Sequence, residues 1–214
     1  MQLSPKRKAL LVTELIVLYV ALPLLYWAER RTLGPWLIPS LLLIGGFCTL
    51  RLLRDPDFER SRLWKADALV PGMRSALRKF FLGSLLVAAL TMLLRPDLVL
   101  AFPLSKPWVW VAILLLYPLL SAYPQEIIFR TYFFHRYRPL IPTRWQVVLS
   151  ATLFGFAHLL LTNWVAVGLS TVGGVLFATT YKRTSSTLLA GLEHGLWGNF
   201  LFTLGLGRFF YAGG

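Results

Sequence analysis

The sequence predicts an all-helical, polytopic membrane protein with about seven transmembrane helices, on the basis of three observations. The 214 residues are 57% hydrophobic and only 14% charged, whereas a soluble domain of this size carries roughly 25% charged residues. The mean hydropathy is +0.64. The apolar residues are gathered into blocks of about membrane length and are not spread over amphipathic helix faces.

Seven apolar blocks are the expected spans. They cover residues 9–28, 34–50, 80–94, 107–123, 145–162, 164–181 and 187–206. The first block follows three basic residues, as in a signal peptide, but it is too long for the apolar region of one and has no clear cleavage site. We therefore expect an uncleaved first span. No repeat or linker interrupts the sequence, so we expect one integral membrane domain over residues 1–214, with a motif-bearing core at about 107–206.

Two semi-polar segments lie between these blocks. Residues 51–79 are long and charged, and we expect them to hold a short interfacial helix that ends at Lys79. Residues 125–138 either extend the fourth span inward or lie along the membrane surface.

The charges between the blocks predict the orientation. If the N-terminus is cytoplasmic, the inner segments hold 17 Lys and Arg residues and the outer segments hold 5, which follows the positive-inside rule. We therefore expect a multi-pass protein of the cytoplasmic membrane, surrounded by membrane lipids, with its C-terminus outside. Topology accounts for the net charge of +13, so no nucleic-acid partner is expected. The single cysteine, Cys48, excludes an internal disulfide and a zinc finger.

The ionisable residues of the second half are few, and each is costly inside a bilayer. From Leu98 onward the only acids are Glu126 and Glu193. Glu126 and Arg130 stand at i and i+4, the favourable order for an ion pair on a helix. Arg130 either neutralises Glu126 near the interface or holds a carboxylate that activates water.

Two histidines lie within the expected spans, beside small residues that allow close helix contact. His158 is in "LFGFAHLL", after the small-residue step of Ala151 and Gly155, and His194 is in "LAGLEHGLWGNFLF", between Gly191 and Gly195.

Two further ionisable residues are expected to have other roles. Glu193 is turned about 100° around the helix from His194, so we expect it to face elsewhere. His135 lies in the aromatic and basic stretch "FFHRYR", where amphipathic side chains are ordinary, and we expect it to be structural.

One carboxylate and two histidines on three helices predict a buried polar pocket that can hydrolyse a bond. Glu126 would be the general base, while imidazole and amide donors would stabilise the oxyanion. Glu126, His158 and His194 could also bind Zn²⁺ as a His₂Glu set with one open position. Neither an HExxH nor a GxSxG motif is present, so a zinc cofactor stays open and no other cofactor is expected.

Three motifs in order, "QEIIFR", "FGFAH" and "HGLWGN", resemble the EExxxR, FxxxH and HxxxN motifs of the CPBP (CAAX protease and bacteriocin-processing, or Abi) intramembrane proteases. The resemblance covers roughly residues 107–206. It implies a helical membrane fold with a polar cavity open toward the cytoplasm and cleavage of peptide bonds near the membrane, in prenylated tails, propeptides or membrane-anchored proteins. It also implies that Arg130 supports Glu126, and that His158 and His194 face the scissile bond.

The chain departs from these motifs at two positions. Gln125 replaces the first acid of the pair, so either Glu126 assumes the role of base, with a bend at Pro124, or the base is missing. Asn199 stands five residues after His194 instead of four, which turns it about 140° away on a regular helix. A π-bulge at Gly198 would restore the shared face; otherwise Asn199 is a packing residue and another group is the donor.

The leading hypothesis is an intramembrane endopeptidase that acts on a membrane-anchored protein or peptide. Glu126 would activate water, and His158, His194 and Asn199 would stabilise the oxyanion. The alternative, favoured by Gln125, is a non-catalytic membrane binding or bacteriocin-immunity protein of the same fold. A transporter or lipid-modifying enzyme is a third class, but transport predicts acids in several helices along a pathway.

Overall fold

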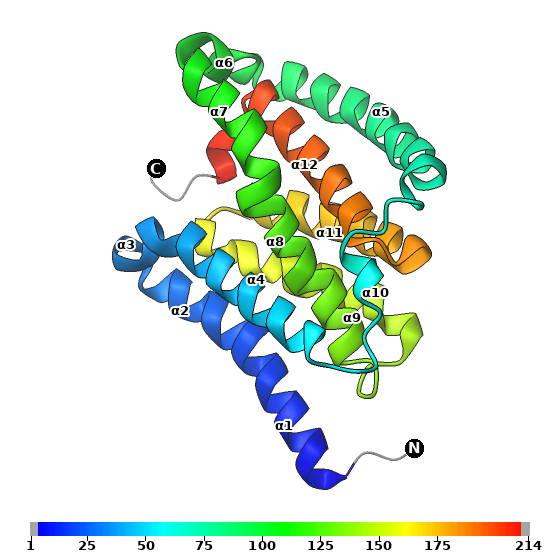
Figure 1. Cartoon of the computed structure of the whole chain (residues 1–214). Coiled ribbons are helices and arrows are strands. Elements are labelled where there is room, and N and C mark those ends of the chain that lie inside the picture. Colours follow the sequence, from blue (N-terminus) through cyan, green and yellow to red (C-terminus); the bar gives the residue numbers. More distant parts are fainter. Residues whose placement is uncertain (1–3, 211–214) are drawn as a thin grey trace.

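The computed structural model describes residues 4–210, and the chain is 86% helical (Figure 1). Residues 4–210 contain no strand. The expected all-helical membrane bundle is therefore confirmed.

The helices follow one another with short connections. In chain order they are α1 (Pro5–Ile16), η1 (Val17–Ala21), α2 (Leu22–Ala28), α3 (Arg30–Leu33), η2 (Gly34–Trp36), α4 (Leu37–Leu53), η3 (Arg60–Leu63), α5 (Leu69–Leu94), η4 (Pro96–Leu98), α6 (Ala101–Ser105), α7 (Pro107–Tyr117), η5 (Pro118–Ala122), α8 (Tyr123–Glu126), η6 (Ile127–Tyr132), α9 (Phe133–Arg136), α10 (Thr143–Ala157), η7 (His158–Leu161), α11 (Trp164–Thr184), α12 (Thr187–Leu204) and η8 (Leu206–Phe210). Of these, η1, η5 and η6 are π-helical and the other η elements are 3₁₀ turns.

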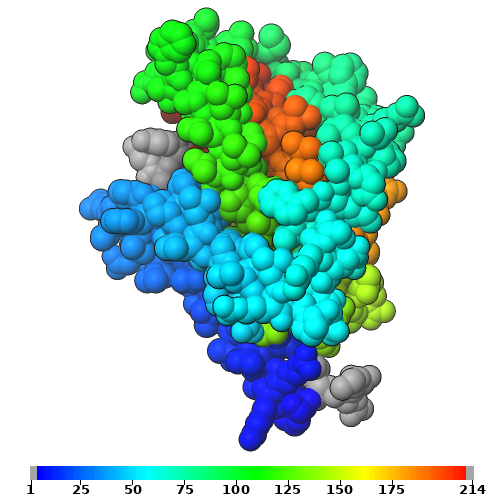
Figure 2. All heavy atoms as spheres, viewed as in Figure 1, coloured from blue at the N-terminus to red at the C-terminus, as the bar shows by residue number. Residues whose placement is uncertain are grey.

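Six helices of the described residues are long and apolar enough to cross a membrane. They are Pro5–Ala28, Arg30–Leu53, Leu69–Leu94, Pro107–Arg136, Thr143–Leu161 and Trp164–Thr184. The seventh expected span is α12, which carries Glu193, His194 and Asn199 and is therefore less apolar. It packs against α5, α8 and α11, and Figure 2 shows it between α5 and α7. Because its neighbours cover it, α12 can hold polar groups that a lipid-facing helix could not.

The third span differs from the expectation. In place of an interfacial helix that ends at Lys79 and a separate span at 80–94, α5 is one continuous helix from Leu69 to Leu94. Pro71 lies in its first turn, where proline is tolerated, and the next proline is Pro96. Nothing between them breaks the helix, and Lys79 is an internal residue whose ammonium group pairs with Glu193 of α12 at 2.6 Å.

The connections meet at two ends of the bundle, as alternate crossing requires. At one end, Lys182 donates to the backbone oxygen of Thr143 (3.1 Å), and the hydroxyl of Ser186 donates to that of Lys65 (2.9 Å). At the other end, the indole of Trp110 donates to Thr203 (2.9 Å). Figure 1 shows the same alternation along α4, α5, α7–α9 and α12.

The small residues sit at close helix contacts, as expected. A Cβ atom at Gly174 of α11 would lie 2.9 Å from the backbone of Ala151 in α10, and one at Gly155 would overlap a side chain of α11. On α12, Cβ atoms at Gly191 and Gly195 would lie 3.0 Å from Tyr123 and Pro118, respectively. These contacts bring the three motif-bearing helices together.

Candidate active site

The carboxylate of Glu126 lies at the centre of the bundle and is fully buried. Its Oε1 accepts a hydrogen bond from Nδ1 of His194 (2.8 Å), and its Oε2 lies 3.1 Å from Nε of Arg130. This second contact is close enough for charge pairing, but neither atom makes a directed hydrogen bond. The expected Glu126–Arg130 pair is therefore present deep inside the protein and not at an exposed helix end.

The guanidinium group of Arg130 is also fully buried. Its Nη2 donates to the backbone oxygen of Gly174 (3.3 Å). The central carbon of the guanidinium group, Cζ, lies 4.3 Å from the ring centre of Phe154. A cation over an aromatic face is stabilised by the ring quadrupole. Arg130 thus anchors Glu126 to α10 and α11 together.

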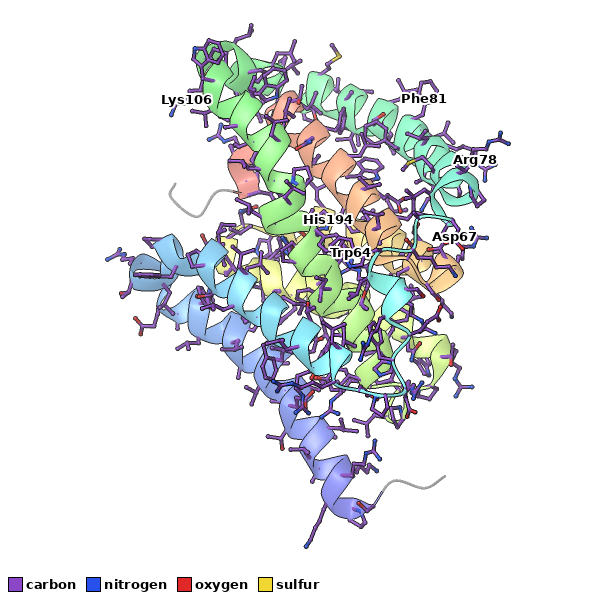
Figure 3. All side chains as sticks on the ribbon, in the orientation of Figure 1. Trp64, Asp67, Arg78, Phe81, Lys106 and His194 are labelled. Carbon is purple, nitrogen blue, oxygen red and sulfur yellow. The ribbon has the colours of Figure 1, made fainter. Side chains whose placement is uncertain are left out.

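The imidazole of His194 is fixed on both sides. It stacks on the ring of Phe177 (4.5 Å, 14°), and its Nε2 lies 3.0 Å from the hydroxyl of Tyr117. Because a carboxylate only accepts hydrogen bonds, Nδ1 carries the proton, so in the neutral ring Nε2 accepts from Tyr117. Figure 3 shows His194 in the middle of the bundle, whereas Arg78 and Lys106 point outward. Arg130, Glu126, His194 and Tyr117 form one polar chain.

His158 lies where α10 ends and η7 begins. Its Nδ1 is 2.8 Å from the backbone oxygen of Phe154, one turn earlier. A carbonyl oxygen only accepts, so Nδ1 carries the proton, and within residues 4–210 no group donates to Nε2 of the neutral ring.

Two cavities meet at His158 and Tyr117. The first, called the α12 cavity, has a volume of about 370 Å³ and lies among α5, α11 and α12. The second, called the α4 cavity, has about 460 Å³ and lies among α4, α7 and η7. Their shared lining residues are Tyr117, His158, Phe202 and Phe210. His194 lines the α12 cavity, whereas Glu126 and Arg130 line neither. The imidazole of His158 and the phenol of Tyr117 are thus the polar groups common to both cavities.

Gln125 lines the α4 cavity, and its amide donates to the hydroxyl of Ser121 (2.8 Å). The position of the first motif acid therefore faces open space, and the second position, Glu126, is enclosed. The helix that carries both contains π-helical turns at Pro118–Ala122 and Ile127–Tyr132, on either side of Pro124.

Two backbone oxygens of the second π-helical turn, η6, accept hydrogen bonds from side chains of other helices. The hydroxyl of Tyr19 donates to the oxygen of Ile128, and the hydroxyl of Ser150 donates to that of Phe129, both at 2.7 Å. Such outside donors stabilise a π-helical turn, whose hydrogen-bond ladder is interrupted. Because η6 includes Arg130 and follows Glu126, η1 and α10 help to fix the geometry of the ion pair.

Asn199 does not reach His194. The helix α12 is regular from Thr187 to Leu204, so the π-bulge at Gly198 that would turn Asn199 toward His194 is not formed. The amide of Asn199 donates to the backbone oxygen of Leu114 (3.0 Å). In an α-helix this oxygen would accept from residue 118, which is a proline without an N–H. Asn199 supplies the missing donor and is a packing residue.

Gly198 stands four residues after His194, where the family motif has an asparagine. The ring of Tyr117 fills the space that the asparagine side chain would occupy. A Cβ atom at Gly198 would overlap the Tyr117 ring and lie 2.7 Å from its hydroxyl oxygen. The phenol hydroxyl thus stands where an asparagine side chain on α12 would start. Tyr117 was not among the predicted site residues; the glycine four residues after His194 is the sequence signal that a neighbouring side chain can take this position.

Glu193 and His135 lie apart from this site. Glu193 is buried and pairs with Lys79, as its separate helix face predicted. Nε2 of His135 is 3.0 Å from Asp55, near the end of α4, and its ring packs edge-on against Phe58.

The predicted zinc ligands do not fit a metal. A His₂Glu site needs three converging lone pairs, but both oxygens of Glu126 face other cations or donors and Nε2 of His194 faces Tyr117. Within residues 4–210, no group of three His, Cys, Asp or Glu side chains could hold a metal ion.

Comparison with known proteins agrees with the motifs. Residues 106–201 match the family model of the type II CAAX prenyl endopeptidases, Rce1-like. No curated protein and no solved structure gave a significant match. The matched segment contains Glu126, His158 and His194 in their motif order. The predicted resemblance to the CPBP family, in its Rce1-like branch of membrane proteases, is therefore confirmed for residues 106–201.

Proposed function

We propose that the protein is an endopeptidase that hydrolyses a peptide bond in a membrane-associated protein or peptide, with His158 as the general base. The observation that carries the proposal is the position of His158 on the shared wall of the two cavities, with an Nε2 atom to which no group of residues 4–210 donates. A peptide that occupies both cavities would pass this atom. A neutral imidazole with an available lone pair can accept a proton from a bound water as that water attacks.

Tyr117 is the second catalytic residue of the proposal. Its hydroxyl lines both cavities and rests on Nε2 of His194. A hydroxyl hydrogen can turn toward a new acceptor, so Tyr117 can donate to an oxyanion, the role that the family motif gives to asparagine. His194, Glu126 and Arg130 are then positioning residues that hold Tyr117.

The atoms of the reaction balance without a further reactant. The water oxygen bonds to the scissile carbonyl carbon while one water proton moves to Nε2 of His158. The resulting oxyanion accepts a hydrogen bond from Tyr117. When the tetrahedral intermediate collapses, the C–N bond breaks and the proton on Nε2 goes to the leaving amine.

That Glu126 activates the water stays a prediction. Its contacts favour another role, in which Glu126 holds His194 and, through it, Tyr117. The carboxylate is enclosed by Arg130 and His194 and lines neither cavity. A base must come within hydrogen-bond reach of the water that it deprotonates. For Glu126 this would require the ion pair to open.

Cleavage of a membrane-anchored peptide in liposomes, followed by mass spectrometry, tests the proposal. We expect His158→Gln to abolish cleavage and Tyr117→Phe to lower kcat by about 10²–10³-fold, the usual cost of a lost oxyanion donor. His135→Gln, a histidine outside both cavities, is the matched control and keeps full activity. If Glu126→Gln abolishes cleavage in a folded protein while His158→Gln retains it, Glu126 is the base and the assignment fails.

A second candidate function is binding without catalysis, and Gln125 favours it. A neutral amide lines the α4 cavity at the position of the first motif acid, and an amide cannot act as a base. In this case the wild type does not cleave, and Gln125→Glu gains activity.

The setting of the proposed activity is the cytoplasmic membrane, with the N-terminus and the basic connections inside. The 17 to 5 distribution of Lys and Arg supports this orientation. We also propose that residues 1–214 act as one domain, since η1 and α4 pack on the motif-bearing helices.

A further inference from the structure

The outer face of α4 is an exposed apolar strip that ends in two arginines. Leu43, Phe47 and Leu50 are 75%, 51% and 55% exposed, and on a helix they fall within an arc of roughly 60°. Arg54 continues the same arc, and Arg51 lies beside it. The apolar part of this strip can face lipid chains, and the arginines stand where α4 leaves the apolar region.

A polar pocket opens beside these arginines. It has a volume of about 230 Å³ and lies between the end of α4 and the segment η6–α9. Its lining residues are Arg51, Leu52, Arg54, Asp55, Tyr132, His135 and Arg136.

The charges of this pocket are only partly compensated. Arg136 makes a two-bond ion pair with Glu14 of α1 (2.9 and 2.7 Å), and His135 pairs with Asp55 at 3.0 Å. Arg51 and Arg54 form no ion pair with any side chain between residues 4 and 210. Two cations therefore remain available to an anion at the mouth of the pocket.

We propose that this pocket is a binding site for an anionic phospholipid, whose phosphate contacts Arg51 and Arg54 and whose acyl chain lies along Leu43, Phe47 and Leu50. A lipid is the occupant because the apolar strip and the cations are continuous on one helix face. Guanidinium groups suit phosphate oxygens, which they bind through paired hydrogen bonds. Basic pockets between transmembrane helices are typical sites for acidic headgroups.

The site is separate from the proposed catalysis but shares a helix with it. Tyr132 and Arg136 of the pocket lie on the same continuous helix, Pro107–Arg136, as Glu126. The proposal depends only on the pocket and the strip, and it stands or falls independently of peptide cleavage.

Native mass spectrometry of the full-length protein, delipidated in neutral detergent, tests this site. The titrants are phosphatidylglycerol, phosphatidylcholine and inorganic phosphate. We expect phosphatidylglycerol to bind at least tenfold more tightly than phosphatidylcholine, and inorganic phosphate neither to bind comparably nor to compete.

The variants assign the binding to the two arginines. Arg51→Gln/Arg54→Gln should reduce phosphatidylglycerol affinity at least tenfold, to the phosphatidylcholine level, while Arg51→Lys/Arg54→Lys retains most of it. Arg30→Gln/Arg31→Gln removes two exposed arginines at the opposite end of α4 and should change nothing. Equal binding of the two lipids, unchanged affinity in the Gln variant, or full competition by inorganic phosphate would overturn the proposal.

Discussion

The buried pair of Glu126 and Arg130 gives the sharpest stability prediction. Both side chains are 0% exposed, so replacing Glu126 with glutamine leaves a guanidinium group without its counter-charge. Breaking a buried pair from one side costs about 3–5 kcal/mol. Arg130 keeps its contacts with Gly174 and the face of Phe154, which offset part of this cost. We therefore expect a loss of about 3 kcal/mol, near the lower limit.

The double variant Glu126→Gln/Arg130→Met separates charge from packing. It removes both charges and keeps a similar volume, which is often nearly neutral for a buried pair. The amide oxygen of Gln can still accept from His194. We expect the double variant to lie within about 1.5 kcal/mol of wild type, so that the coupling between the two positions is at least about 1.5 kcal/mol.

Equilibrium unfolding in bicelles measures these free energies, and thermal unfolding in detergent provides a second readout. For a chain of this length, 3 kcal/mol corresponds to about 6–12 °C in Tm. Asp97→Asn is the control, because its partner Arg95 lies 2.6 Å away on an exposed surface, where such a pair contributes little. If the double variant loses as much as the two single variants together, packing and not uncompensated charge determines the cost, and the reasoning is refuted.

Three substitutions test other parts of the account by the same unfolding measurement. Asn199→Ala leaves the oxygen of Leu114 without its donor and should cost roughly 1 kcal/mol without abolishing cleavage; loss of cleavage in a folded variant would restore a catalytic role. Tyr19→Phe removes the donor to Ile128 in η6 and should cost about 1–2 kcal/mol, and an unchanged stability would show that the π-helical turn needs no outside donor. Gly198→Ala places a methyl group against the phenol ring of Tyr117. It should lower the free energy of unfolding by about 1–3 kcal/mol and lower kcat. Full activity of this variant would contradict the close contact.

The fold followed from the sequence because membrane burial leaves a strong pattern. The apolar blocks predicted where the six membrane-length helices lie, and a seventh block corresponds to α12. The pattern was weaker where a helix extends beyond the apolar region: α5 begins at Leu69, among charged residues, and only its apolar half was predicted as a span. Interfacial and membrane-spanning helices do not differ in local propensity, so the junction at Lys79 could not be predicted.

Most residues of the candidate site were predicted from the sequence, but the role of each residue was not. The residue types and the family motifs predicted a polar pocket of Glu126, His158 and His194. In the structure Glu126 contacts Arg130 and His194, whereas His158 lies on the wall of the two cavities. The exposure of Gln125 and the enclosure of Glu126 depend on two π-helical turns, which have no reliable sequence signature. Tyr117 was missed because a tyrosine in an apolar span is ordinary, and only its contact with Gly198 gives it significance.

The measurement that tests the central claim most directly is the cleavage of an anchored peptide by four proteins in the same liposomes: wild type, His158→Gln, Glu126→Gln and Gln125→Glu. We expect that the wild type cleaves, that His158→Gln does not, and that Glu126→Gln retains reduced cleavage because it still accepts from His194. An inactive wild type, together with cleavage by Gln125→Glu, would contradict the role of His158 and identify the protein as a non-catalytic binding protein.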